Sequence, residues 1–469
     1  MKQLMQKFIK FCAIWFFVFA VYVISPVMVS GDSRWTIHTA ESIIKEGNTD
    51  LNEYQGVVQA VGYTTIMRQR HVYQYFSDGP VLFALPLIYI GEFVCNKIRH
   101  NSSLQTTLRW AIASYLKYSG PRETARFKKF LSRYLPVTTD TPQELAQAIP
   151  FSLVTLHPFA EVCISSFYLA IAATLLFCIA RMMLSFGYAL LSTIIFSFCT
   201  ANWSLASRAL WQHSPAIFLL TVALYFIILA ENKPKYIIWL APILGFLFMV
   251  RPSIAIFIFT GYVFGYYRRY FFIYCVILLT FMGLFMWYCR AIYGSFIHPY
   301  YLSEVSKFFS PRNFLESFFG QILSPGRGIF IYTPIFVFSV AGFWYKFRHK
   351  RLTPVERVQA VIIIATLFLI SLYPKWHAGW SYGARYFSEM TPFMVYFLIC
   401  YIAVKKPFSL KGRKNNFYSF LFLVLLLGSF FIHLRGATDI NTWQWSNYPI
   451  RIDRAPWRVW DWKDLPFLR

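Results

Sequence analysis

Long apolar runs alternate with short polar segments along almost the whole chain of 469 residues. An apolar run of about 20 residues is long enough to cross a bilayer as a helix. Runs near this length predict eleven membrane-spanning helices, at 8–29, 154–180, 183–200, 214–230, 236–250, 253–267, 270–289, 329–345, 358–373, 386–404 and 416–434. The expected fold class is an all-α, polytopic integral membrane protein, with a transmembrane domain at 1–434 and an extracytoplasmic, tryptophan-rich tail at 435–469.

The amino-acid composition supports this class. Hydrophobic residues make up 57% of the chain and the mean hydropathy is +0.47, which is more apolar surface than one soluble core can bury. The eight cysteines fall mostly inside apolar runs and lack metal-ligand spacing, so they are expected to be small core residues. The run at 8–29 is long and has no small-residue cleavage site, which predicts a spanning helix rather than a signal peptide.

Basic residues in the short connections orient the helices. Lys or Arg residues occur in every second connection, at 181, 233–235, 268–269, 346–357 and 405–414. Because basic residues are enriched in cytoplasmic loops, we expect these loops and the N-terminus in the cytoplasm. The other connections are then extracytoplasmic, and the longest of them is 31–150. The net charge of +25 suits contact with anionic lipid headgroups.

A further apolar segment, 79–96, tests this orientation. Counted as a crossing, it would place all later basic loops outside the cell. It contains Pro80, Pro86 and Glu92, which weaken it as a spanning helix, so we expect an interfacial helix in the external loop. The segment 97–133, with nine basic residues and one acid, Glu123, then becomes external, and long loops translocate largely regardless of charge.

Asp32 is the first carboxylate after the first apolar run. A carboxylate where a membrane helix meets water is well placed to take a proton from a substrate that is linked to lipid. Asp and Ser are also preferred helix caps, and the segment 35–44 carries apolar residues at helical spacing. Asp32 is therefore a candidate catalytic base, and capping of the following helix by Asp32 and Ser33 is the alternative.

Three of the expected external loops combine arginine with glycine or aromatic residues. They contain Arg208 and His213 at 200–213, Arg327 between two glycines at 324–328, and Trp376, His377, Arg385 and Tyr386 at 376–386. Arginine forks and bare backbone amides bind phosphate, and aromatic side chains suit a sugar face or a prenyl chain. Each arginine alone could anchor a helix end at the headgroups. The recurrence of the pattern favours a shared anionic ligand.

The order of these features resembles the GT-C membrane glycosyltransferases, a superfamily that includes the protein O-mannosyltransferases and the lipid A aminoarabinose transferases. In that superfamily an acid follows the first helix, and interfacial helices follow in a long first external loop. The matching stretches are Gly31-Asp32-Ser33 and Phe76 to Pro86, and 207–215, 324–329 and 376–386 look like those of uncharacterised bacterial members. The chain departs from the pattern in lacking a second acid next to Asp32 and in its insertion at 97–150.

The resemblance implies a multi-pass protein of the bacterial inner membrane with an active site that faces the periplasm. It implies transfer of a sugar from a polyprenyl-phosphate donor to an acceptor hydroxyl on a lipid, glycan or protein, with inversion and with Asp32 as general base. Arg251 also follows an apolar run at the expected outer boundary, where a charge is usually functional. The expected ligands of the donor phosphate are Arg385, Arg327 and Arg251, and the expected substrate-binding residues are Asp78, Arg208, His213, His298, Trp376, His377 and Tyr386.

The expected partners are the lipid donor and membrane lipids, without nucleic acid. His213, His298 and His377 are expected outside, but their spacing does not indicate a metal site, and we expect them to hydrogen-bond to sugar or phosphate. No cofactor is certain, and a divalent metal remains an alternative.

Other functions stay open on the sequence alone. A ligase or polymerase that uses lipid-linked glycans would differ only in its donor. A transporter or flippase of lipids or sugars should show repeated halves and ionisable residues near mid-membrane, whereas here the charges cluster at the ends of the runs and no repeat is seen. A scaffold would explain the tail tryptophans, which otherwise indicate an interfacial belt, but not the arginine loops.

Overall fold

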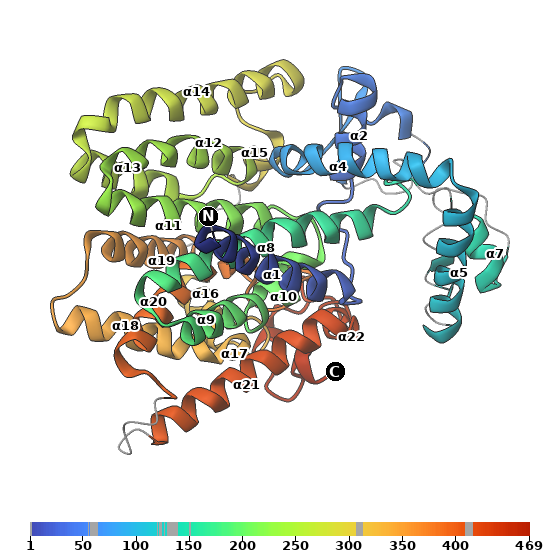
Figure 1. Ribbon diagram of the computed structural model, residues 1–469. Helices are drawn as coiled ribbons and strands as arrows, with labels where there is room; N and C mark the ends of the chain where they lie inside the picture. The colour runs from blue at the N-terminus through green and yellow to red at the C-terminus, as the bar shows by residue number, and fades with distance from the viewer. Residues whose placement is uncertain are drawn as a thin grey trace. The chain divides into compact units, whose positions relative to one another are not determined.

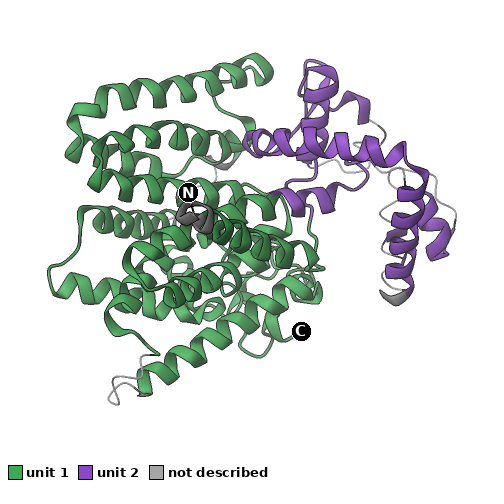
Figure 2. Ribbon diagram, viewed as in Figure 1, with its two compact units in different colours: residues 1–29, 165–469 green, residues 30–164 purple. Residues whose placement is uncertain are grey.

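The computed structural model describes residues 2–54, 56, 64–119, 121, 124–125, 127–128, 139–149, 152–305, 313–408 and 416–469. Parts of the predicted insertion at 97–150, including Glu123, and of the basic loop at 405–414 lie outside these ranges. The chain forms two compact units, and unit 1 comprises residues 1–29 and 165–469 while unit 2 comprises residues 30–164 (Figure 2).

Unit 2 is a small helical unit with one β-hairpin. Its elements are α2 (Thr36–Glu46), the 3₁₀ helix η1 (Asn52–Tyr54), β1 (Thr65–Arg68), β2 (His71–Gln74), α4 (Gly79–Arg99), α5 (Ser102–Ser119), α7 (Pro142–Gln147) and the beginning of α8 (His157–Met183). The hairpin pairs Thr65 with Gln74 and Arg68 with His71. Its two-residue turn places Gln69 and Arg70 at positive φ, as the twist of a tight hairpin requires.

Helix α2 confirms the helix expected after Asp32. Trp35, directly before the helix, packs its indole against Leu51 and Val72. The helix ends at Gly47, whose φ of 71° gives the left-handed conformation that glycine adopts without steric cost.

Unit 1 contains the remaining helices. They are α1 (Lys2–Ile24), the rest of α8, α9 (Phe186–Phe198), α10 (Ala201–Ser204), η3 (Ala206–Arg208), α11 (His213–Asn232), η4 (Pro234–Trp239), α12 (Leu240–Val250), α13 (Ile254–Tyr266), α14 (Arg268–Tyr293), α15 (Pro299–Val305), α16 (Phe314–Leu323), α17 (Ile329–Tyr332), η6 (Pro334–Phe336), α18 (Val337–Arg348), α19 (Pro354–Ser371), η7 (Arg385–Met390), α20 (Thr391–Lys405), α21 (Asn416–Thr438), α22 (Asn441–Gln444), η9 (Pro456–Trp460) and η10 (Pro466–Leu468). Helix α12 packs against α11 and α14, and α20 packs against α18 and α9 (Figure 1).

Eight helices within the described ranges are long and apolar enough to cross a membrane. They are α4, α8, α9 with α10, α11, α14, α19, η7 with α20, and α21 from Phe417 onward. Shorter apolar helices occur at Phe8–Ile24, Pro234–Val250, Ile254–Tyr266 and Phe314–Leu323. The chain thus has the helices of a multi-pass membrane protein. Because α4 is itself long enough to cross, the interfacial placement of 79–96 stays a prediction.

The exposed surface of unit 1 suits a lipid environment. Helix α14 exposes Phe272 and Trp287 by 80% and 70%, and α21 exposes Phe417 by 70%. Large apolar side chains clustered on one surface are unfavourable in water and are expected where a helix faces lipid. Helix α20 is by contrast almost wholly buried by its neighbours.

The run predicted as one helix at 329–345 is divided into α17, η6 and α18. The division occurs at Pro334, which has no backbone N–H and cannot continue a helix through its preceding turn. Side chains of α21 bond to the chain at the break. The backbone N–H of Ile335 donates to Ser429 Oγ at 3.0 Å, and the Thr333 side-chain Oγ1 lies 3.0 Å from His433 Nε2. The expected single spanning helix is therefore not formed.

The C-terminal tail is part of the unit 1 core. Trp443 and Trp445 are completely buried, so these two do not form the expected interfacial belt, whereas Trp457 and Trp462 are exposed. Trp443 packs with residues from distant segments of unit 1, including Val27, Trp211 and Tyr382. The tail therefore packs within unit 1.

Candidate functional site

Four polar side chains from distant parts of unit 1 meet at one end of α11. His213 is the first residue of α11, Arg251 directly follows α12, and Arg385 and Glu389 lie in η7. Glu389 Oε1 lies 2.7 Å from Arg251 Nη1 and 3.0 Å from His213 Nδ1, and Arg385 Nε lies 3.1 Å from His213 Nε2. Three of the residues predicted from sequence thus form one cluster around a carboxylate.

The partners of His213 define its protonation state. The arginine Nε–H only donates, so His213 Nε2 must accept from Arg385 and carry no proton. The proton then resides on Nδ1, which donates to the Glu389 carboxylate. The imidazole is therefore neutral, and the cluster carries two guanidinium charges and one carboxylate charge, a net charge of +1.

Aromatic rings hold the two guanidinium groups. The Arg385 guanidinium lies 4.0 Å from the centre of the Trp211 ring, and that of Arg251 lies 5.8 Å from the Tyr386 ring. Both distances fall in the range of cation–π attraction. Trp211 is 3% exposed, and its indole N–H has no hydrogen-bond partner among the described residues. The cluster thus offers cations and a buried donor to an anionic, polar ligand.

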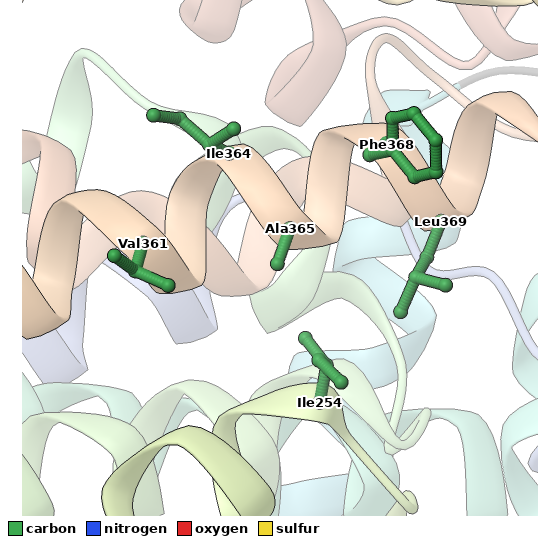
Figure 3. Close-up of a pocket in the computed structure, with 6 residues that line it drawn as sticks. All are labelled: Ile254, Val361, Ile364, Ala365, Phe368 and Leu369. Carbon is green, nitrogen blue, oxygen red and sulfur yellow. The ribbon is translucent and has the colours of Figure 1, made fainter. Parts of the chain in front are cut away.

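An apolar groove is lined by residues from α13 and α19, the helices next to the arginine cluster in sequence or packing. Val361, Ala365 and Leu369 recur every fourth residue on α19 and face Ile254 at the start of α13 (Figure 3). With Ile364 and Phe368 they line a cavity of about 350 Å³. Ile254 is three residues from Arg251, and α19 also packs against η7, which carries Arg385.

Arg327 was predicted to bind the donor phosphate with Arg385 and Arg251, and its hydrogen bonds go to partners outside the cluster. It is 1% exposed, and it donates to the carbonyls of His377, Gly326 and Gly379 at 2.6, 2.9 and 2.8 Å and to Ser446 Oγ at 2.9 Å. Burial lowers its pKa to about 10, so it stays charged at neutral pH. These bonds join three loops, which is a structural role.

Arg208 also has structural partners. It is completely buried and donates to the carbonyls of Tyr22, Ser25 and Val27, with a distance of 2.8 Å to Ser25. It therefore ties the end of α1 and the segment after it to the turn before α11.

The other residues expected in this unit lie around the loops and the tail. Trp376 is buried with Trp445, and burial lowers the pKa of His377 to about 4, so its imidazole is neutral at neutral pH. His298 is buried, its ring lies 4.6 Å from that of Tyr293, and its Nδ1 accepts the backbone N–H of Tyr300 at 3.3 Å. Tyr386 alone among the predicted aromatics lies at the arginine cluster.

The predicted base lies in unit 2, in a turn that precedes α2. Asp32 is half-buried, between the buried residues Gly31 and Ser33. The position that caps α2 is occupied by Trp35, whose side chain makes no capping bond, and Ser33 Oγ instead donates to Glu161. Ser33 is therefore not the cap that the alternative interpretation required, and Asp32 does not occupy the capping position.

Asp78 is a buried residue of unit 2 directly before α4. Its Oδ1 accepts a hydrogen bond from Gln74 Nε2 at 2.6 Å, which joins the hairpin to the start of the helix. This contact gives Asp78 a structural function within the unit.

Sequence reasoning missed two acids, Glu389 and Glu161. Both lie inside or beside apolar runs that were predicted to span, and both are buried. An ionisable residue within a spanning helix is usually functional, so this rule was the available signal.

No group of three or more His, Cys, Asp or Glu side chains within the described ranges is arranged to hold a metal ion. Comparison with known protein families, with curated proteins and with solved structures finds no match for this chain.

Proposed function

We propose that the protein is a membrane glycosyltransferase that moves a sugar from a polyprenyl-phosphate donor to an acceptor hydroxyl at the outer face of the bacterial inner membrane. The observation that supports this most strongly is the arginine cluster of unit 1 together with the nearby apolar groove. A lipid phosphate has the matching chemistry, an anionic head on a long apolar chain.

The arginine cluster supports binding of the phosphate. Arg385 is held by His213 on one edge and by the Trp211 ring on one face, so its planar fork is oriented before a ligand arrives. Preorganised cations stabilise negative charge that develops on a leaving group, because they need no reorganisation during the reaction. A donor phosphodiester carries one negative charge, which matches the net charge of the cluster.

The groove supports binding of the chain. Its six lining residues are all apolar, and several of them are also exposed on the surface of α19. Burial of apolar surface contributes about 25 cal/mol per Å², so several isoprene units would add several kcal/mol to binding. The groove and the cluster together therefore select a phosphate that carries a lipid chain.

In the proposed reaction the acceptor oxygen attacks the anomeric carbon while the bond from that carbon to the phosphate oxygen breaks. The electron pair of the broken bond stays on the lipid phosphate, which Arg385 and Arg251 stabilise. Asp32 takes the proton of the acceptor hydroxyl. One displacement inverts the anomeric centre, and no covalent sugar–enzyme intermediate forms.

The first test is Asp32→Asn. Asn accepts hydrogen bonds but takes no proton, and loss of a general base typically lowers the rate about a hundred- to ten-thousand-fold. We expect that loss in release of polyprenyl phosphate from a panel of synthetic polyprenyl-phosphate hexoses and pentoses, in proteoliposomes of bacterial lipid. The melting temperature and donor binding should not change.

Binding is measured separately, by the melting temperature of the purified protein. Polyprenyl phosphate should raise it, whereas polyprenol without phosphate and inorganic phosphate should have small effects. Wild-type turnover in Asp32→Asn would exclude Asp32 as the base. Movement of the lipid across the proteoliposome membrane without sugar transfer would indicate a flippase instead.

A further inference from the structure

Unit 2 contains a completely buried carboxylate, that of Glu161 in the second turn of α8. Its Oε1 accepts a hydrogen bond from Ser30 Oγ at 2.7 Å, and its Oε2 accepts one from Ser33 Oγ. These serines lie two residues before and one residue after Asp32. One carboxylate therefore holds the chain on both sides of the predicted base.

The cost of burying a carboxylate makes this contact strong. An ionised carboxylate in a buried site is unfavourable unless hydrogen bonds compensate it, and bonds to an ionised acceptor are roughly twice as strong as neutral ones. Displacing either serine would leave a carboxylate oxygen of Glu161 with one bond fewer. The positions of Ser30 and Ser33 are thus coupled to Glu161.

Backbone bonds extend this constraint along the turn. Arg34 N–H donates to the Gly31 carbonyl at 3.3 Å, and Thr36 N–H donates to the Ser33 carbonyl at 2.9 Å, where α2 begins. Gly31 and Ser33 are buried, and Asp32 between them is half-buried. The turn therefore fixes the two buried neighbours of Asp32.

We infer that Glu161 is a positioning residue that fixes the Asp32 turn through the hydroxyls of Ser30 and Ser33. The inference rests on the proposed function, in which Asp32 is the base. Glu161 does not itself take the proton of the acceptor. A displacement of a reacting group by about 1 Å lowers rates as much as a hundredfold, so loss of this clamp should reduce turnover.

Two substitutions of Glu161 separate positioning from proton transfer. Glu161→Leu removes both acceptors and introduces an apolar side chain of similar size. Glu161→Gln keeps a carbonyl acceptor for one serine and an amide donor toward the other, whose hydroxyl can rotate to accept. The two variants differ in hydrogen bonding, but neither can act as a base.

For Glu161→Leu we expect kcat for the polyprenyl-phosphate sugar panel to fall about ten- to a hundredfold, with an unchanged KM for the donor. Glu161→Gln should recover most of the lost rate. Backbone hydrogen exchange at 30–36 should rise in Glu161→Leu and return toward the wild-type rate in Glu161→Gln.

A serine variant covers the case in which Glu161→Leu does not fold. Ser33→Ala removes one of the two bonds and should lower kcat, whereas Ser192→Ala, whose hydroxyl donates to the Tyr188 carbonyl, should not. Combined with Glu161→Gln, Ser33→Ala should cost less than the sum of the single effects, because both act on one contact.

Any one of three results would overturn the inference. The first two are a wild-type kcat in Glu161→Leu and a wild-type kcat in Ser33→Ala. The third is a loss of kcat in Glu161→Gln as large as in Asp32→Asn, which would make Glu161 the base. Asp32→Asn is measured in parallel. If Asp32→Asn is inactive while Glu161→Leu has wild-type activity, only the inference fails. An active Asp32→Asn would exclude Asp32 as the base, and with it the inference that rests on that base. If the wild-type protein transfers no sugar from the panel, the proposed function fails.

Discussion

The arginines of unit 1 differ in what their guanidinium groups contact. Arg327 donates to three backbone carbonyls and a serine, and Arg208 donates to carbonyls near the end of α1. Arg385 contacts a histidine nitrogen and an indole ring and is only half-buried. Similar glycine- and aromatic-rich surroundings in the sequence therefore correspond to two different sets of contacts.

This difference in contacts predicts that an Arg→Lys substitution lowers stability at position 327 and weakens ligand binding at position 385. Arg327→Lys loses the planar fork and leaves buried carbonyls without donors, which should lower the free energy of unfolding by about 1–3 kcal/mol. Arg385→Lys should leave stability nearly unchanged but weaken the binding of polyprenyl phosphate. Thermal unfolding measures the change in stability, and the shift of the melting temperature on adding polyprenyl phosphate measures binding.

The two variants serve as each other's controls. A stable Arg327→Lys protein that binds polyprenyl phosphate weakly would return Arg327 to the phosphate site. Unchanged binding by Arg385→Lys would reduce Arg385 to a headgroup anchor.

The candidate site could be predicted only in part. Arg385, Arg251 and His213 were identified because arginine and histidine at helix ends are chemically conspicuous. Glu389 was not, because its partner His213 lies 176 positions away and a single sequence does not show such pairs. The same limit applies to the contacts of Arg327, because most of its acceptors are backbone carbonyls, which have no sequence signature.

Among the helices, close approach is clearest between α18 and α20. A Cβ on Gly342 would lie 2.1 Å from the Phe397 carbonyl oxygen, so the two helices touch where this glycine lies. Small residues allow such contact between membrane helices, which pack by van der Waals attraction. Apolar length predicted most helices well, because a long apolar run specifies a helix in lipid.

Gly342→Ala should therefore be destabilising. The added methyl group must push α18 from α20, and overpacking of this kind costs about 1–3 kcal/mol. Gly428→Ala on α21 is the matched control, since its Cβ would meet nothing within 4 Å and alanine favours helix. Thermal unfolding in detergent would compare the two, and equal melting temperatures would contradict the close contact.

Interruptions of a helix within an apolar run were harder to predict than the helices themselves. The segment 329–345 has the composition of one helix, yet Pro334 divides it, and Ser429 and His433 of α21 bond to the segment at the break. Those partners come from about a hundred residues further along the chain. The sequence shows the proline but not whether neighbouring helices will stabilise a break there.

At the scale of the whole molecule, the orientation in the membrane is the prediction that most others depend on. The distribution of basic residues predicts that residues 31–150 lie outside and the loop at 233–235 lies inside. Cysteines introduced at Ser102 and Lys233 should react with an impermeant maleimide from opposite sides of the membrane. If both react from the same side, 79–96 crosses the membrane and the external assignment of the sites is wrong.

The core around Trp443 affects how the protein matures in the cell. It joins Val27, next to the first helix, to Phe467, which the ribosome adds more than 400 residues later. The helices can enter the bilayer one after another, but this core cannot close until the last segment has been made. Nascent chains that stop early would carry inserted helices with an open apolar surface, which quality-control proteases can recognise.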